Sequence, residues 1–157
     1  MDVHKLFDDP RLTTLGLFFE AYGGVVAKLE PVWKAHGLSG LDVNALMRLS
    51  RSPGRRLRMT ELAAQTELST SGVTRLIDRL ARSELVVREL DPGDRRGAFA
   101  VLTEAGAARL AQVLPDYLAA VDRWFVGLLT PEQLAALSEA LRIIRDKSNP
   151  EATFRMD

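Results

Sequence analysis

The sequence predicts an all-α fold that is interrupted once, near the middle of the chain, by a small β-hairpin. Apolar residues recur every three or four positions toward both ends of the chain, which is the period of amphipathic helices. The period changes to short apolar runs at 85–90 and 97–102, and the turn-forming residues Asp91-Pro-Gly-Asp94 separate the two runs. With 157 residues, the chain is long enough for one domain with its own core.

A long helix is predicted over residues 10–36. Its first apolar row is Leu12, Leu15, Phe19, Tyr22, Val26, Leu29 and Trp33, and a second row adds Phe18, Val25 and Val32. This stripe is wider than one small core requires of a terminal helix. Pro31 is expected to bend or interrupt the helix near its end. Gly37 is expected to end it, and Ser39 to cap the next helix.

The middle of the chain is predicted to hold a loop followed by two short helices. The loop, Arg51-Ser-Pro-Gly-Arg-Arg56, is rich in turn-forming residues. Thr60 is expected to cap a helix over 61–66, and a second helix is expected over 70–82. This second helix has Val73, Leu76, Ile77 and Leu80 at helical spacing. Two short helices joined by about four residues form the helix-turn-helix pattern.

A hairpin and two further helices are predicted to follow. A basic hairpin directly after a helix-turn-helix is typical of a wing, so the predicted fold class is a winged helix-turn-helix. Thr103 is expected to cap a helix that reaches about Leu129 and bends at Pro115. The segment Thr130-Pro-Glu-Gln133 predicts the start of a last helix, and the tail after Asp146 is expected to be loose.

Positive charge is concentrated in the middle of the chain, although the net charge is zero. Eleven arginines lie between Arg48 and Gly97 against seven acidic residues, so this segment is basic and the rest of the chain is acidic. A face that binds phosphate produces this kind of asymmetry. A GC-rich codon bias would also enrich arginine, and the composition alone does not separate the two explanations.

The composition excludes several classes of function. Because the chain has no cysteine, thiol nucleophiles, thiol redox sensing and Cys-ligated zinc or iron–sulfur sites are excluded. Two histidines leave little for a metal site, and no nucleophile–base pair or phosphate loop is found, so we expect no enzyme, metal or cofactor. No apolar run is long enough to span a bilayer, and the N-terminus lacks a signal-peptide core, so we expect a soluble cytoplasmic protein.

The polar face of the helix over 70–82 is the candidate site for a nucleic acid. It carries Thr70, Ser71, Thr74, Arg75, Asp78, Arg79 and Arg82. A recognition helix enters the major groove with its N-terminal residues at the base edges, where small hydroxyl side chains allow close approach. Arg75 is best placed for a bidentate contact with guanine. An ordinary amphipathic surface helix would show the same pattern.

The tip of the hairpin is a second candidate contact. Arg95 and Arg96 fit a wing that enters the narrow minor groove, although a solvated turn is also common. Asp91 and Asp94 are turn formers rather than acid–base catalysts, because no suitable partner is nearby. Asp78 is expected to pair either with an arginine of the wing or with a neighbour on its own helix.

Four segments together resemble the multiple antibiotic resistance regulator (MarR) family. They are Thr60-Glu-Leu-Ala63, Ser69-Thr-Ser-Gly-Val-Thr-Arg-Leu-Ile-Asp-Arg-Leu80, Asp91-Pro-Gly-Asp-Arg-Arg96 and Leu102-Thr-Glu-Ala-Gly106. The combined motif is specific, whereas each piece alone is not. The chain departs from the family pattern at Glu84, where Gly is usual, and at Val87-Arg-Glu89, where Glu-Arg followed by Arg is usual.

The resemblance implies a homodimeric regulator, expected to be a repressor, that binds a pseudo-palindromic operator. It implies dimerisation helices at 10–36 and 103–147 and a DNA-binding region at 40–102. The residues expected in the major groove are Thr70, Ser71, Thr74 and Arg75, and Arg79 is expected to be a further DNA-binding residue. Arg96 with Arg95 would reach the minor groove, and Asp78 and Asp94 would position the wing.

The resemblance also implies a small effector, because many relatives bind phenolic or other aromatic acids between the dimerisation and DNA-binding regions. Trp33, His36 and Met47 are the candidate ligand contacts. Trp33 could equally be a core or dimer residue, and His36 could interact only with the C-terminal end of its helix. The absence of cysteine excludes the thiol-oxidation response of some relatives.

The main alternative is a winged-helix module that binds other proteins without reading a DNA sequence. Winged helices can bind proteins, and the near-neutral overall charge is compatible with that function.

Overall fold

The structure is a computed structural model that describes residues 7–152, without the side chains of Arg95 and Arg96. Its helices are α2 (Pro10–Ala35), α3 (Gly40–Ser50), α4 (Met59–Thr66), α5 (Thr70–Arg82), α6 (Glu104–Trp124) and α7 (Pro131–Ser148). Its strands are β1 (Arg56–Arg58), β2 (Val86–Asp91) and β3 (Asp94–Leu102), and 3-10 turns cover Pro53–Arg55, Val126–Leu128 and Pro150–Ala152.

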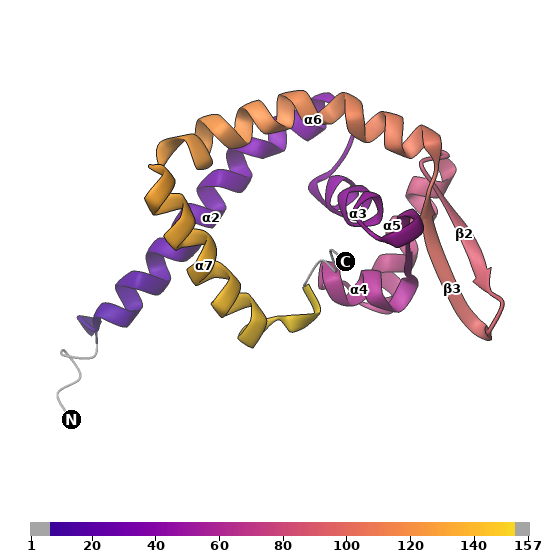
Figure 1. Cartoon of the computed structure of the whole chain (residues 1–157), viewed down its shortest axis with the longest axis horizontal. Helices are drawn as coiled ribbons and strands as arrows, with labels where there is room; N and C mark the ends of the chain where they lie inside the picture. The colour runs from indigo at the N-terminus through magenta and orange to yellow at the C-terminus, as the bar shows by residue number, and fades with distance from the viewer. Residues whose placement is uncertain (1–6, 153–157) are drawn as a thin grey trace.

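The helices and the sheet form a compact lobe with a long helical extension. The lobe contains α3, α4, α5 and a three-stranded antiparallel sheet in the order β1-β3-β2 (Figure 1). The helices α2 and α6 extend away from the lobe, and α7 runs back so that the end of the described chain lies beside α4 (Figure 1). The predicted fold class, all-α with a β-hairpin wing, is confirmed.

Polar caps begin the helices that the sequence predicts most clearly. Ser39 and Asp42 form a reciprocal capping box at α3, and Thr130 and Gln133 form another at α7. The Thr103 hydroxyl accepts the N–H of Gly106 at the start of α6. These helices begin where the sequence predicts because the caps satisfy backbone N–H groups that have no partner within the helix.

Several predicted boundaries were wrong. Residues Arg56–Arg58 form a third strand, β1, that was not predicted; its buried Leu57 lies opposite Ala100 of β3, and its first residue, Arg56, was predicted as the end of a loop. As a result α4 begins at Met59, with Arg58 rather than Thr60 at the N-cap position. Pro31 does not interrupt α2, which continues past it to Ala35. At the other end, α6 stops at Trp124, and a separate 3-10 turn follows.

The core lies in the lobe and in the first half of α6. Its largest fully buried side chains are Leu46, Leu49, Leu62, Val73, Ile77, Val86 and Val113. In contrast, α2 buries only Leu29, and α7 buries no residue. The large apolar side chains left exposed on these two helices are Leu12, Leu15, Leu17, Phe18, Phe19, Tyr22, Ile143 and Ile144.

The C-terminal end of the described chain is attached to the lobe, although the tail after Asp146 was predicted to be loose. Arg48 is 8% exposed, and its guanidinium donates to Asn44 Oδ1 (2.8 Å), Gln65 Oε1 (3.2 Å) and the carbonyl oxygen of Ala152 (3.3 Å). Burial lowers the pKa of Arg48, and the negative charge of Glu67 opposes this shift. A buried cation needs such acceptors, which helical periodicity does not reveal.

Gly106 is predicted to tolerate no side chain. A Cβ atom at this position would lie 2.1 Å from the carbonyl oxygen of Leu85 and 2.7 Å from Leu102 Cδ1. We therefore expect Gly106→Ala to lower the free energy of unfolding, measured by urea denaturation, by about 3 kcal/mol or more, because backbone must move. The matched control is Ala105→Gly, an exposed neighbour that should lose only about 1 kcal/mol of helix propensity. Equal losses in the two variants would contradict the close packing.

Candidate nucleic-acid interface

The helix α5 presents a polar, solvent-facing surface because its apolar side chains are used by the core. Val73, Leu76, Ile77 and Leu80 are all buried. On the other side Thr70, Ser71 and Arg75 are exposed, and Thr74 is half-buried. Ser69 caps the helix through the N–H of Gly72 (3.1 Å), which keeps the first turn, with Thr70 and Ser71, at the surface.

The hydroxyl groups of this first turn have local partners. Thr74 Oγ1 donates to the carbonyl oxygen of Thr70 at 2.9 Å, and Ser71 Oγ lies 3.2 Å from Ser69 Oγ. These contacts hold the hydroxyl groups against their own helix. Arg75, one turn further along, is the exposed long cationic side chain of this face.

Arg79 lies on the same helix but is paired with the protein itself. Its Nη2 atom lies 2.5 Å from Asp42 Oδ1, and Asp42 is buried. The other oxygen of Asp42 accepts the N–H and the hydroxyl of Ser39, both at 2.8 Å. Arg79 therefore joins α5 to the capping box of α3, a contact that was not predicted because its partners are 37 positions apart in the sequence.

The hairpin β2–β3 stands beside α5 and is attached to it. Asp78 Oδ1 of α5 lies 3.3 Å from Arg88 Nη1 of β2, so its partner is a wing arginine, while Arg82 Nε donates to the backbone carbonyl of Asp78 and not to its carboxylate. Arg95 and Arg96 lie in β3 near the turn, but their side chains are outside the part of the chain that the structure describes. Asp94 begins β3, close to Gly97.

Two residues that shape the hairpin, Asp91 and Arg58, were not predicted to do so. Asp91 was treated as a turn former only, yet its Oδ2 atom lies 2.6 Å from Arg58 Nη1 of β1. Its Oδ1 atom accepts the N–H of Gly93 at 2.9 Å. The alternation of arginines at positions 56 and 58 was the signal for a strand, but three residues are too few to stand out from a loop.

The three candidate effector residues lie at the junction of α2, α3 and α6. The rings of Trp33 and Tyr117 are 6.0 Å apart, and both pack against the lobe core, as does Met47. Burial raises the pKa of Tyr117. His36 Nε2 lies 2.8 Å from Asp116 Oδ2, and the backbone carbonyl of His36 accepts a hydrogen bond from Arg109. Each of the three residues thus already has a partner within the chain.

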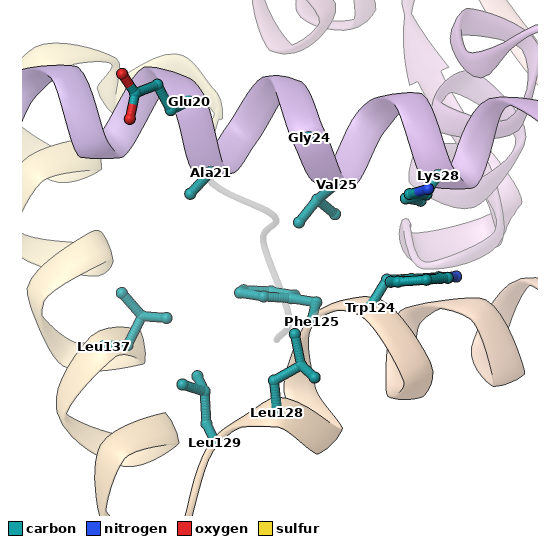
Figure 2. A pocket seen from close by; sticks show the side chains of 10 residues that line it. All are labelled: Glu20, Ala21, Gly24, Val25, Lys28, Trp124, Phe125, Leu128, Leu129 and Leu137. Carbon is teal, nitrogen blue, oxygen red and sulfur yellow. The ribbon is translucent and has the colours of Figure 1, made fainter.

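A pocket of about 450 Å³ lies elsewhere, between α2 and the connection from α6 to α7 (Figure 2). Its lining is mainly apolar: Ala21, Val25, Phe125, Leu128, Leu129 and Leu137, with Trp124 and Lys28 at one end (Figure 2). Lys28 Nζ is 4.7 Å from the centre of the Trp124 ring. The pocket therefore belongs to the helical extension and not to the surface formed by α5 and the hairpin.

Within residues 7–152, no group of three or more His, Asp or Glu side chains could hold a metal ion. In the same part of the chain, no helix is long and apolar enough to cross a membrane.

A helix-turn-helix whose second helix faces solvent, with a β-hairpin beside it, defines a winged helix-turn-helix protein. The sequence model of the MarR family matches residues 36–97. The Bacillus subtilis transcriptional repressor YetL is 34% identical over 124 residues, which are 75% of this chain and 74% of YetL. The chain therefore belongs to the MarR family of transcriptional regulators.

Solved structures of two Streptomyces coelicolor MarR family regulators resemble this chain along most of its length. The structure of AbsC is 37% identical, with a TM-score of 0.82, and the match covers 88% of this chain and 94% of AbsC. The structure of Sco3205 in complex with DNA is 32% identical, with a TM-score of 0.81, and the match covers 91% of each chain.

Asp42 is predicted to stabilise the lobe through two elements at once. We expect Asp42→Ala to lower the free energy of unfolding by about 2–4 kcal/mol, because it removes the α3 capping box and the partner of Arg79. Ser39→Ala removes only the cap and should cost about 1 kcal/mol, measured by the same chemical denaturation. Equal costs would show that the contact with Arg79 contributes nothing.

Proposed function

We propose that the protein is a homodimeric repressor that binds a pseudo-palindromic DNA operator. The observation that carries this proposal is the division of α5 into a buried apolar face and an exposed face with Thr70, Ser71 and Arg75. The similarity to Sco3205, whose structure contains DNA, and to YetL, which is a repressor, supports it. A regulator of this kind performs no chemistry on its ligand, and it works in the cytoplasm with the DNA that it binds.

Each polar residue of α5 has a proposed role. Thr70, Ser71 and Thr74 allow the helix to approach the base edges, and Arg75 makes the bidentate contact with a guanine. Arg79 contributes to DNA binding through its ion pair with Asp42, which sets the tilt of α5. Because of this ion pair, the Arg79 side chain has less freedom to reach DNA. Arg96 and Arg95 carry positive charge into the minor groove, with Asp78 and Asp94 supporting the wing.

The region 40–102 is the proposed DNA-binding region, and 10–36 with 103–147 form the proposed dimer interface. The exposed aromatic side chains of α2 and the exposed Ile143 and Ile144 of α7 would otherwise face water. The apolar pocket between α2 and α7 lies on the same helical extension (Figure 2). A second copy of the chain would cover these surfaces, and its two-fold symmetry matches a palindromic operator.

For the effector, we propose that a small aromatic acid acts at Trp33, His36 and Met47. The contact between His36 and Asp116 gives this proposal its mechanism, because a ligand carboxylate would compete with Asp116 for the imidazole. The exchange would loosen the link between α2 and α6 at the base of the lobe.

The two groove contacts are predicted to have different signatures. Arg75→Ala should weaken binding to a selected operator duplex by about 10- to 100-fold and relax the preference at one base pair. Arg96→Ala should weaken binding to all sequences about equally and reduce the salt dependence by about one phosphate contact. Fluorescence anisotropy over a series of salt concentrations and selection from a random DNA pool measure both effects.

The control for this experiment is Arg55→Ala, which removes an arginine that pairs with Glu104 at 2.8 Å. It should bind the duplex as the wild type does. Wild-type affinity in both Arg75→Ala and Arg96→Ala would show that the groove assignment is wrong.

The dimer is predicted to depend on the exposed apolar side chains of α2 and α7. We expect a dimer at micromolar concentration by light scattering, and a monomer for Phe19→Glu with Ile144→Glu, because both side chains are more than half exposed within one chain. Leu90→Glu, at an exposed apolar position of the wing, should leave the dimer intact. A wild-type monomer would contradict the proposed interface.

A further inference from the structure

The outer face of the sheet carries an arrangement of charged and aromatic side chains. The strand register places Arg58 of β1 and Glu89 of β2 on either side of Phe99 of β3. Neighbouring residues alternate between faces, so Leu57 and Ala100 point into the core while this set points away from it. The set therefore lies on the side of the wing opposite α5.

Two guanidinium groups cover the Phe99 ring. Arg56 lies 3.8 Å and Arg58 lies 5.0 Å from the ring centre, within the range of a cation–π contact. Arg56 Nη1 is also 3.6 Å from Glu89 Oε2. The ring and the carboxylate thus hold the arginine side chains across β3 instead of leaving them free in solvent.

Arg58 reaches further than its own strand. The strand β1 ends at Arg58, whose backbone lies opposite Phe99. The guanidinium of Arg58 contacts Asp91 at the beginning of the hairpin turn. The Asp91 side chain is only 8% exposed. Among the side chains that the structure describes, none directs a hydrogen-bond donor at the buried Asp91 Oδ2, so its contact with Arg58 is a close ion pair and not an aligned hydrogen bond. The other oxygen of Asp91 holds the turn through Gly93.

Gly97 makes room for this ion pair. A Cβ atom at position 97 would lie 3.3 Å from each of three atoms: Arg58 Nη1, Asp91 Cβ and Asp94 Oδ2. The absence of a side chain therefore allows Arg58 to cross β3 toward β2. Any larger residue at this position would crowd the crossing.

The wing needs such support because its outer part lies beyond the core. Leu90 is 80% exposed, and its partner in β3 is Ala98, two positions outside the buried Ala100. A two-stranded hairpin is only marginally stable by itself. The inner side of the hairpin is attached to α5 through Asp78 and Arg88. The side chain of Arg58 supplies the matching attachment on the outer side.

We propose that Arg58 is a positioning residue for DNA binding, which holds the wing turn through Asp91 and Phe99 so that the turn meets the minor groove. This inference rests on the proposed function, since it assigns Arg58 a role in placing Arg96. Arg58 acts through the wing and makes no contact with DNA itself. Loss of the Arg58 side chain therefore weakens DNA binding by no more than the wing contributes to the affinity.

The first test measures the wing without DNA. Hydrogen exchange of the backbone amides in 90–98 should become faster by about tenfold in Arg58→Gln, because the outer attachment is lost. Gly97→Ala crowds the same contact without changing any charge, and it should have a similar effect. Arg55→Gln is the matched control: it removes the same charge and an ion pair with Glu104, and should leave exchange in the wing unchanged. Unchanged exchange in Arg58→Gln would overturn the proposal, whether or not the protein binds DNA.

The second test is a double-mutant cycle with Arg96→Ala, using a duplex that the wild-type protein selects from a random pool. Arg58→Gln should weaken binding about tenfold in the wild-type background, which is about 1.4 kcal/mol, and less than twofold in the Arg96→Ala background. In Arg58→Gln, the flanking minor grooves should lose their protection from hydroxyl radicals. The guanines contacted in the major groove, measured separately, should stay protected.

If Arg58→Gln also weakens binding about tenfold in the Arg96→Ala background, Arg58 contacts phosphate directly. That result would overturn its positioning role. Failure of the wild-type protein to select any sequence would contradict the proposed function, whereas the exchange measurement would still decide the role of Arg58 in the wing. Arg58→Lys keeps the charge that pairs with Asp91, so we expect it to restore most of the affinity that Arg58→Gln loses.

Discussion

Burial of one face of α5 is the constraint on which the rest of the lobe depends. Val73, Leu76, Ile77 and Leu80 pack against α3, α4 and the sheet, so the helix cannot rotate without exposing apolar area. The direction in which Thr70, Ser71 and Arg75 face is therefore a consequence of core packing. The polar residues that would read DNA contribute little to holding the helix in place.

Ion pairs then fix the remaining degrees of freedom around α5. Arg79 joins the helix to the capping box of α3, and Asp78 joins it to β2. On the far side of the sheet, Arg58 joins β1 to the hairpin turn. The arginines of the lobe all carry the same charge, but they have two different roles. Some face solvent, and others position neighbouring elements. A high arginine content serves both purposes in this lobe.

The sequence predicted the fold class, the presence of the helices and three of their caps because each depends on local patterns, whereas the Thr60 cap was wrong. Ser39, Thr103 and Thr130 cap their helices as expected, and the buried residues of α5 follow its helical period. The strand β1 was not predicted, because three residues carry too little periodicity. The contacts of Asp42 and Asp91 were missed for a different reason: their partners are distant in sequence, and no local pattern encodes them.

The buried Arg48 has a consequence for the order in which the chain folds. Its last acceptor, the carbonyl of Ala152, comes 104 residues later in the sequence, and contacts of such separation close slowly. Asn44 and Gln65 are near enough to meet Arg48 while the lobe assembles. We therefore expect the lobe core to assemble before the Pro150–Ala152 turn docks on Arg48, so that this contact forms late in folding.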